Sequence, residues 1–332
     1  MEVDAAGRTV AISNPDKVFF PERGETKLDL VRYYLALEGP VMRAVGGRPV
    51  LMERYPDGAG GKSFFQKRVP KGAPDWLRTL VVQTPNGTPS EALVADDIAH
   101  VAWAVNLGCL GFHAWPVLAD DPEHADELRI DLDPTPGVTL AMVREAAAEA
   151  RSLLEEAGLA GFPTTTGRDG IHVHCPLTGG YSSLQVRAAA VAFARELERR
   201  RPDLVTAQWW KEDRGVRVFV DFNQNAPHKT MFAAWGARPR PGGQVACPFR
   251  WEQLPDIDPE VFTIATVPAL VAEHGDPWDG MEDHRRSLEV LLGWSERDLA
   301  GGLMDAPWPP VYPKMPGEPP RVSRSRAKKP GG

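Results

Sequence analysis

The residues best suited to chemistry in this chain are Asp131 and Asp133, in the stretch Leu-Arg-Ile-Asp-Leu-Asp-Pro at 128–134. Apolar and polar residues alternate there, so a β-strand would place both carboxylates on one face. Two such carboxylates repel each other unless a divalent cation lies between them, and hard oxygen ligands suit Mg²⁺ or Mn²⁺. Pro134 would end the strand and leave the pair near an exposed mouth. The alternative is a solvated strand face with two ordinary aspartates.

A third carboxylate, Asp221, ends another predicted strand over residues 216–221. Alternation there places Val216, Val218 and Val220 on one face, and Asp221 on the opposite face. Three polar residues, 223–225, follow directly. Asp221 is therefore a candidate third member of the same carboxylate site.

A hydroxyl- and glycine-rich stretch, residues 164–170, precedes a strand that contains His172 and His174. Such loops present backbone N–H and hydroxyl groups to phosphate oxygens. Alternation places both imidazoles on one face, where they would serve as metal or phosphate ligands. The alternative, two structural histidines, stays open from these residues alone.

Two lysines flank a predicted turn and helix start near the N-terminus. Asn14-Pro15-Asp16-Lys17 is typical of a turn, and Thr26 is a suitable N-cap for a helix over about residues 28–37. Lys17 and Lys27 lie beside that helix start, and helix N-termini attract phosphate. The alternative is a pair of solvated lysines.

An aromatic pair, Phe64 and Phe65, precedes Lys67 and Arg68. Adjacent residues of a strand point to opposite faces, so we expect one ring in the core and the other exposed. An exposed ring beside two cations could stack on a nucleobase. The alternative places both rings in the core.

The elements that must position these residues follow from periodicity and turn signals. At 332 residues the chain is long enough for one large domain or two lobes. We expect an acidic loop over 120–126, and an extended or disordered proline-rich, basic segment from residue 307. We divide the chain into a catalytic domain, 1–300, and a tail, 301–332. The predicted helices cover about 96–106, 142–157 and 184–200; the predicted strands cover 48–55, 112–115 and 171–174.

Composition excludes several classes of protein. With 42% hydrophobic and 25% charged residues the chain is not globally disordered, and no apolar run approaches the roughly 18 residues of a membrane span. The start, Met-Glu-Val-Asp, is unlike a signal peptide, and Cys109, Cys175 and Cys247 have no zinc spacing, so we expect packed, reduced thiols in the cytoplasm. The net charge is −7, so any phosphate-binding patch must be local.

Taken together, these segments resemble the polymerase domain of bacterial DNA ligase D, a branch of the archaeo-eukaryotic primase superfamily, and within it the stand-alone actinobacterial primase-polymerases. The resemblance implies an α+β, primase-like fold of two packed lobes, with β-sheets flanked by helices and the active site in the cleft. The matching stretches, in the family's order, are Asn14-Pro15-Asp16-Lys17, Arg54-Tyr55-Pro56-Asp57-Gly58, Phe64-Phe65-Gln66-Lys67, Asn106-Leu107-Gly108, Asp131-Leu132-Asp133-Pro134, Gly170-Ile171-His172 and Asp221-Phe222-Asn223-Gln224-Asn225.

The resemblance also implies roles for single residues. Asp131, Asp133 and Asp221 match the catalytic ligands of two metal ions, Mn²⁺ or Mg²⁺. Asn14, Lys17 and Lys27 match a pocket for a downstream 5′-phosphate, and Phe64 and Phe65 match a template-stacking pair. The residues that match nucleotide contacts are His113, Thr166, His172, Arg214, Gln224 and Arg238.

The chain departs from the family pattern at the nucleotide loop. Thr164 and Asp169 occupy two positions that are usually lysine, and Trp235-Gly236-Ala237-Arg238 replaces Tyr-Ser-x-Arg. We expect Arg168 to restore one charge toward the nucleotide. For that, the loop would bend through its two glycines and aim Arg168 at the nucleotide and Asp169 at solvent.

The implied function is template-directed transfer of NTPs or dNTPs to a primer 3′-hydroxyl, with a preference for ribonucleotides. The substrate would be broken DNA ends in non-homologous end joining, or short gaps with a 5′-phosphate. A DNA ligase and the end-binding protein Ku are implied partners, at the bacterial nucleoid and with no membrane. One rival is a non-catalytic 5′-phosphate-binding module that recruits a ligase; another is a metal-dependent phosphoesterase.

Overall fold

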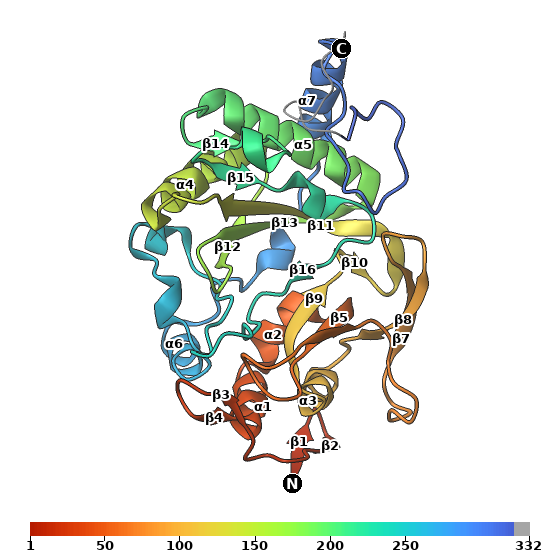
Figure 1. Ribbon diagram of the computed structural model, residues 1–332, viewed down its shortest axis with the longest axis vertical. Coiled ribbons are helices and arrows are strands. Elements are labelled where there is room, and N and C mark those ends of the chain that lie inside the picture. The colour runs from red at the N-terminus through yellow and green to blue at the C-terminus, as the bar shows by residue number, and fades with distance from the viewer. Residues whose placement is uncertain (322–332) are drawn as a thin grey trace, which may run out of the picture.

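The computed structural model describes residues 1–321, and this part of the chain forms two lobes, each built on a six-stranded sheet (Figure 1). Both helices and sheets contribute to each lobe, so the predicted α+β class with two packed lobes is confirmed. None of the helices in these residues combines the length and apolar character needed to cross a membrane.

The first lobe contains the N-terminal elements. Its sheet has the order β16-β9-β5-β8-β7, with β6 paired to β5, and every pair is antiparallel. The strands are β5 (Pro49–Arg54), β6 (Phe64–Gln66), β7 (Thr79–Gln83), β8 (Pro89–Val94), β9 (Cys109–Ala114) and β16 (Met231–Phe232). The helices are α1 (Lys27–Ala36), α2 (Glu38–Val45) and α3 (Ile98–Asn106), and two small hairpins join β1 (Glu2–Ala5) to β2 (Arg8–Ala11) and β3 (Val18–Phe20) to β4 (Glu25–Thr26).

The second lobe contains the central sequence. Its sheet has the order β12-β13-β11-β15-β14, with β10 paired to β11, and only β14 and β15 run parallel among the described pairs. The strands are β10 (Val117–Leu118), β11 (Asp121–Pro134), β12 (Phe162–Thr165), β13 (Ile171–Ser182), β14 (Val205–Thr206) and β15 (Val218–Val220). The helices are α4 (Leu140–Glu156), α5 (Ser183–Arg200) and α7 (Glu289–Ala300), with short 3-10 turns η1 (Lys211–Asp213) and η2 (Phe222–Asn225).

The chain crosses between the lobes after η2. β16 adds to the first sheet, and α6 (Val267–His274) lies low in Figure 1, whereas α7 returns to the helices of the second lobe. Three further 3-10 turns lie on this path: η3 (Trp251–Asp256), η4 (Pro259–Val261) and η5 (Met281–His284).

The alternation in the central strand sets the direction of its carboxylates. Leu128, Ile130 and Leu132 are buried in the core that α4 and α5 share with the sheet. The opposite face, which carries Asp131 and Asp133, must therefore point away from these helices. Figure 1 shows the first lobe on that side, so both aspartates lie between the lobes.

The strand is longer than its sequence indicates, and the acidic loop predicted over 120–126 is wrong: β11 begins at Asp121. Arg48 donates to both carboxylate oxygens of Asp126, at 2.6 and 2.9 Å, and Arg129 donates to the carbonyl of Ala114 at 2.9 Å. Asp126 pairs with Arg48 of the first lobe, and the local sequence around Asp126 gives no sign of this distant partner. These contacts join the two lobes.

The segment after α7 has no helix or strand, but it is not a detached tail. Trp308 and Tyr312 are buried, and they pack with Ala226 at the end of η2. The prediction of an extended or disordered segment is therefore wrong for residues 307–321, because aromatic side chains anchor it. The remaining basic residues, from Arg324 to Lys329, lie outside the described residues. The three cysteines are free and buried, as predicted.

Candidate active site

Three carboxylates converge at the cleft end of neighbouring strands. Leu132 on β11 lies opposite Val220 on β15, which brings Asp221 beside Asp131; the Asp221 N–H donates to the Asp131 carbonyl at 2.9 Å. One oxygen each from Asp131, Asp133 and Asp221 can be chosen so that all three lie within 4.8 Å of one another. Asp131 is buried, Asp221 is half-buried and Asp133 is exposed at the mouth. The predicted carboxylate cluster is therefore formed.

The cluster fits a divalent cation. The Oδ1 atom of Asp131 is buried and accepts no hydrogen bond; Nε2 of His172 lies 3.3 Å away without hydrogen-bond geometry. Gln224 holds the other side, with Nε2 donating to Oδ2 of Asp131 at 3.0 Å and of Asp221 at 3.3 Å. Crowded carboxylates with a free buried oxygen are the donors that Mg²⁺ or Mn²⁺ prefers.

Repulsion among the three carboxylates raises the pKa values of two of them. Burial and the charges of Asp131 and Asp133 raise the pKa of Asp221 to about 7. Partial desolvation and the neighbouring Asp131 raise the pKa of Asp133 to about 6. Without a cation, Asp133 and Asp221 therefore keep their protons up to near neutral pH, whereas ordinary aspartates lose theirs at about pH 4.

We predict that the metal-free protein loses stability as pH rises from about 4 to about 7. The folded state binds more protons than the unfolded state in this window, because the folded pKa of Asp221 is raised. Asp221→Asn removes this charge and keeps an oxygen for the Asn223 N–H, which donates to Oδ1 at 3.0 Å. In chelator at pH 8 the variant should be more stable, by on the order of 3 kcal/mol.

Denaturant unfolding of both proteins at pH 4.5 to 8 measures this difference. The two stability curves should converge at the acid end, and saturating Mn²⁺ should stabilise the wild type only. Parallel curves across the whole range would contradict the predicted repulsion.

A cavity of about 430 Å³ adjoins the cluster and is lined by both lobes. His113 of β9 and Phe232 of β16 come from the first sheet. The residues from the second lobe and its loops include Asp131, Asp133, Thr166, Arg168, Asp169, His172, Gln224 and Arg238. Eight predicted site residues thus surround one cavity, whereas Asp221 and Arg214 do not line it.

Arg238 is held over the cavity by an aromatic ring and a carbonyl. Its guanidinium carbon lies 3.5 Å from the centre of the Phe232 ring, and Nε donates to the Thr166 carbonyl. Burial and the nearby Arg168 lower the pKa of Arg238 to about 10, so the side chain stays charged at neutral pH. The sequence indicated Arg238 as a site residue, but no local pattern indicated that the Phe232 ring would hold its guanidinium.

Arg214 is fixed in a similar way outside the cavity. Its guanidinium carbon lies 3.4 Å from the centre of the Phe219 ring, and it donates to the carbonyls of Gln208 and Trp209. Burial lowers its pKa, and Asp221 and Asp133 act in the opposite direction. Arg214 therefore faces the carboxylate cluster from the side of β15.

The nucleotide loop, residues 164–170, is tightly turned, and only part of its predicted arrangement is observed. Oγ1 of Thr166 accepts from the Arg168 and Gly170 N–H groups, and Gly167 has φ +67°, where a Cβ would lie only 2.6 Å from Cγ of Arg238. Arg168 and Asp169 are both exposed and both line the cavity, so the loop does not separate the two side chains in the way expected. A one-residue step in such a turned loop does not reverse the side-chain direction as it does in a strand.

Thr164 is fully buried, and its hydroxyl donates to the Thr165 carbonyl. Thr164 occupies a position that is usually lysine in the family. Here that position belongs to the core and contributes no side chain to the cavity.

The two histidines of β13 have different surroundings. His172 lies opposite Asp131 in the antiparallel pair, at the cluster. Nδ1 of His174 lies 2.9 Å from Oε2 of the buried Glu127, which also pairs with Arg129. His174 thus belongs to a buried ionic network, as the structural alternative supposed, whereas His172 belongs to the candidate site.

His113 joins the cavity to the aromatic pair. Its Nε2 lies 3.1 Å from Oε2 of Glu53, a residue that sequence reasoning missed. The imidazole makes edge contacts with Phe65 at 5.5 Å and Phe232 at 5.3 Å between ring centres. The aromatic pair therefore adjoins the cavity.

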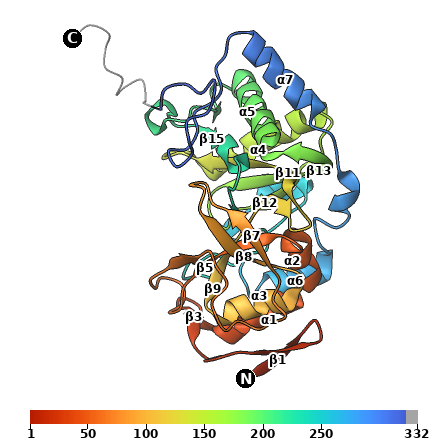
Figure 2. The same ribbon diagram turned by 90° about the vertical axis from the view of Figure 1, so that its right-hand side faces the viewer.

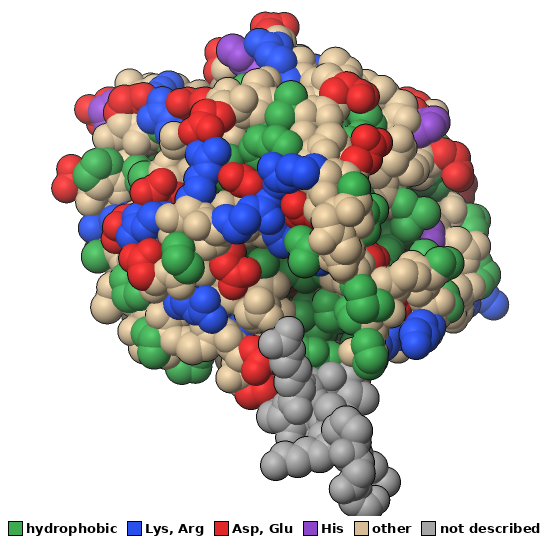
Figure 3. Space-filling model, turned by 90° about the horizontal axis from the view of Figure 1, so that it is seen from above, with side chains coloured by type: hydrophobic (Ala, Val, Ile, Leu, Met, Phe, Trp, Pro, Cys, Tyr) green, Lys and Arg blue, Asp and Glu red, His purple; other side chains and the backbone are tan. Residues whose placement is uncertain are grey.

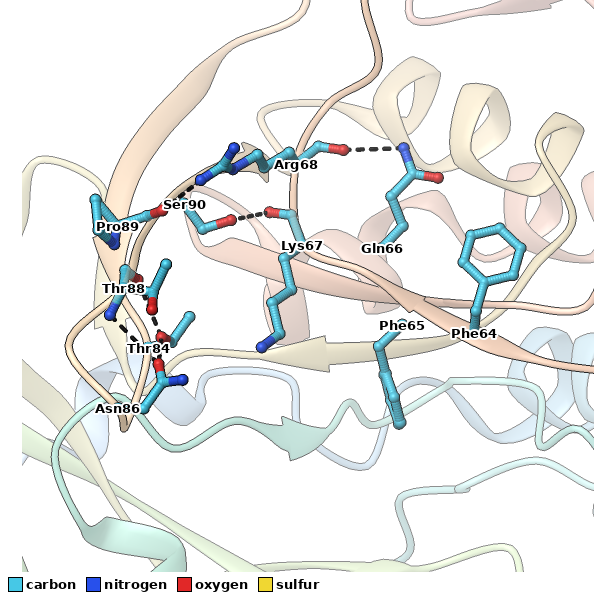
Figure 4. Close-up of a pocket in the computed structure, with 10 residues that line it drawn as sticks. All are labelled: Phe64, Phe65, Gln66, Lys67, Arg68, Thr84, Asn86, Thr88, Pro89 and Ser90. Atoms are coloured by element: carbon cyan, nitrogen blue, oxygen red, sulfur yellow. Dashed lines mark hydrogen bonds between the residues drawn. The ribbon is translucent and has the colours of Figure 1, made fainter. Parts of the chain in front are cut away.

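Phe64 and Phe65 are both exposed, at 47% and 54%, so the predictions of one or two core rings are wrong. The rings do point to opposite sides of β6, as Figure 4 shows, but among the described strands this short strand pairs only with β5, and neither ring is buried. A groove of about 570 Å³ runs from these rings past Lys67 and Arg68 to the β7–β8 turn. Lys67 points to the same side as Phe65.

The predicted phosphate patch gathers at one place but differs in its details. The Lys17 N–H donates to the Asn14 carbonyl, and the first α1 N–H groups donate to the Lys17 and Pro15 carbonyls, so the helix start offers few free donors. The Lys17 ammonium lies 2.7 Å from Oδ1 of the exposed Asp57. The Lys27 ammonium is buried and donates to the Ser13 and Asn106 carbonyls.

The helical face of the second lobe is electrostatically balanced. Figure 3 shows basic and acidic side chains interspersed there. Many are paired, as in Arg200 with Glu156 at 2.8 Å and Arg201 with Glu149 at 2.9 Å. Among the described residues, this face therefore shows no unopposed basic surface of the kind that nucleic-acid backbones require.

Comparisons with known proteins agree with this geometry. Residues 26–278 match the model of the family described as LigD, primase-polymerase domain. A Mycobacterium tuberculosis multifunctional non-homologous end joining DNA repair protein LigD is 34% identical over 280 residues, which cover 82% of this chain and 37% of that protein. The LigD protein of Pseudomonas aeruginosa is 30% identical over 291 residues, which cover 87% and 34%. The chain thus spans about a third of the length of these relatives.

The fold has a solved counterpart. The structure of the polymerase domain from Mycobacterium tuberculosis ligase D in complex with DNA matches with a TM-score of 0.78 and 31% identity. The match covers 83% of this chain and 99% of that one. The likeness therefore extends over the whole of that domain.

Proposed function

This chain belongs to the LigD primase-polymerase family, and from that premise we propose that it adds nucleotides to the 3′-hydroxyl of a DNA primer opposite a template. The observation that carries the proposal is the cluster of Asp131, Asp133 and Asp221 beside a cavity lined by arginines and histidines. A non-catalytic end-binding module would have no use for this costly arrangement of charges.

The three aspartates would hold divalent cations, which supply charge neutralisation for the primer hydroxyl and the leaving pyrophosphate. Gln224 keeps Asp131 and Asp221 together, through hydrogen bonds to both. We propose Mn²⁺, with Mg²⁺ as the alternative; both ions accept carboxylate ligands.

The triphosphate would lie along the cavity. Arg238, Arg168 and His172 would offset its negative charge, the Thr166 loop would position it, and Arg214 would act from the β15 side. His113, held by Glu53, would separate the triphosphate from the templating base. The preference between ribose and deoxyribose would be set in the same cavity, and we propose ribonucleotides.

The template strand would follow the groove in Figure 4. Exposed aromatic rings stack on bases whatever their sequence, and Lys67 and Arg68 would contact the backbone. Because Phe65 contacts His113, a stacked template base would adjoin the incoming nucleotide.

Asn14, Lys17 and Lys27 would bind a downstream 5′-phosphate. Lys17 would make the direct contact, whereas the buried Lys27 would add charge from below and hold the loop through the Ser13 and Asn106 carbonyls. The biological substrate would then be a short gap or a broken end with a 5′-phosphate. Ku and a DNA ligase are the proposed partners, at the nucleoid.

Lys17→Ala should weaken binding to gapped duplexes that carry a downstream 5′-phosphate and leave binding to 5′-hydroxyl duplexes nearly unchanged. Loss of one phosphate contact should also lower the slope of log K against log salt by about 1. Fluorescence anisotropy at several salt concentrations measures both effects. Asp57→Asn is the matched control: it frees Lys17 from its ion pair, so binding to the phosphorylated duplex should tighten. Equal weakening on both duplexes would assign Lys17 to the general backbone instead.

Primer extension on a gapped duplex, with each nucleotide set and either Mn²⁺ or Mg²⁺, tests the function itself. Template-dependent growth of the primer supports the proposal. Release of nucleotides from the labelled strand would indicate a phosphoesterase, and binding without growth would indicate the non-catalytic module.

A further inference from the structure

The segment after α7 makes a specific contact behind the carboxylate cluster. Residues 305–321, here called the C-terminal strap, lie beyond residue 278, where the family match ends. Figure 2 shows this dark blue segment beside β15. The strap is organised by Glu318, whose buried carboxylate accepts from the Trp308 and Met315 N–H groups and from Arg321.

One buried arginine joins the strap to the second lobe. Arg187 of α5 donates to both carboxylate oxygens of Asp305, at 2.9 and 3.1 Å, and to the Ala306 carbonyl at 2.9 Å. Its guanidinium carbon lies 3.8 Å from the centre of the Trp308 ring. Its Nε donates to Oδ1 of Asn223 at 2.8 Å.

Asn223 carries the contact to the cluster. Its Nδ2 donates to the strap at the Pro307 carbonyl, at 3.0 Å, and its backbone N–H donates to Oδ1 of Asp221, at 3.0 Å. Asn223 is 1% exposed, so its side chain is almost entirely removed from water. The backbone group that holds Asp221 therefore belongs to a residue whose side chain the strap fixes.

The rest of η2 is held from two sides. Asn225 exchanges hydrogen bonds with the backbone of Arg129 on β11, at 2.7 and 2.9 Å. At the far end, Ala226 packs with Trp308 and Tyr312, and the Tyr312 hydroxyl donates to the Pro227 carbonyl. Four residues in a 3-10 turn have little rigidity of their own, so these external contacts determine where Asp221 and Gln224 lie.

We propose that the C-terminal strap positions the metal-binding carboxylates, with Trp308, Arg187 and Asn223 as positioning residues for Asp221 and Gln224. The inference rests on the proposed metal-dependent function. Partners that orient metal ligands affect metal affinity without contacting the metal. The strap would thus make cation binding depend on a segment outside the matched domain.

Titration of Mn²⁺ followed by electron paramagnetic resonance tests this without turnover. Trp308→Ala and Asn223→Ala should each raise the Mn²⁺ dissociation constant about 10-fold, the lower end of the effect of losing such an orienting partner. Trp308→Phe keeps an aromatic face over Arg187, so its affinity should stay within about twofold of the wild type. High Mn²⁺ should restore extension by both alanine variants.

Val41→Ala is the control for general loss of stability. Val41 is 2% exposed in the core of the first lobe, so this variant should melt earlier but bind Mn²⁺ normally. Unchanged Mn²⁺ affinity in Asn223→Ala and in folded Trp308→Ala would overturn the proposal and leave the strap a stabilising element only. If the wild type binds Mn²⁺ no better than Asp131→Ala, the proposed metal site fails instead, so the two failures are distinguishable.

Discussion

Asp131→Ala should abolish primer extension, with a loss of at least about 1,000-fold in rate, because bound metal contributes several kcal/mol and each 1.4 kcal/mol is tenfold. Asp131 is the centre of the cluster: it has the free buried oxygen, it accepts from Gln224, and its backbone carbonyl accepts from Asp221. No other side chain in the described residues can take its place. The loss should persist at high Mn²⁺, unlike that of the strap variants.

Single-turnover extension of a gapped duplex measures this loss. Asp131→Asn should behave similarly, because the amide keeps the shape but is a poor metal ligand. Asp203→Asn, which removes an exposed carboxylate paired with Arg201, should extend normally. Thermal unfolding should show that Asp131→Ala is folded; extension at the wild-type rate would refute the assignment of the cluster.

Arg238→Ala should lower kcat/KM for the nucleotide by about 100-fold, as expected when one preorganised charge on a phosphoryl group is lost. The effect should be large because the guanidinium is already fixed by Phe232 and by the Thr166 carbonyl. Arg238→Lys should recover only part of the activity, because an ammonium cannot reproduce the planar contact with the ring.

Nucleotide titrations on one gapped template separate the two components. The loss should appear mainly as a higher KM if Arg238 binds the ground state, and mainly as a lower kcat if it stabilises developing charge. Arg200→Ala removes a charge from the distant, balanced face and should leave both constants unchanged. A normal kcat/KM for Arg238→Ala would mean that Arg168 and His172 suffice.

The sequence by itself determined the central strand and the catalytic aspartates on it. A strict alternation of apolar and polar residues can satisfy a half-buried strand in one register only, so Leu128, Ile130 and Leu132 had to face the core and Asp131 and Asp133 the other side. The Thr26 N-cap and the approximate bounds of its helix were likewise local, since a cap and its helix are a few residues apart.

Only the tertiary structure decided which predicted residues are available to a ligand. Lys27 looked like a free cation, but its ammonium is already bound to carbonyls from two distant segments. One ring of Phe64 and Phe65 was expected in the core, but both are exposed, because the short strand that carries them pairs only with β5 among the described strands. Exposure depends on what the rest of the chain places nearby, and the residue's own neighbours in sequence do not contain that information.

At the third carboxylate, Asp221, part of the information was likewise local and part came only from the tertiary structure. The end of a strand and the polar run after it marked Asp221 as a candidate, but its distance from Asp131 was decided by the pairing of β11 with β15. The strap is the extreme case. Its proline-rich composition is typical of an extended tail, yet Trp308 and Tyr312 bury it, because Arg187 and Asn223, more than 80 residues away, offer buried donors for its backbone carbonyls. Local sequence determines the conformations a segment prefers, whereas long-range partners for its polar groups determine where it lies.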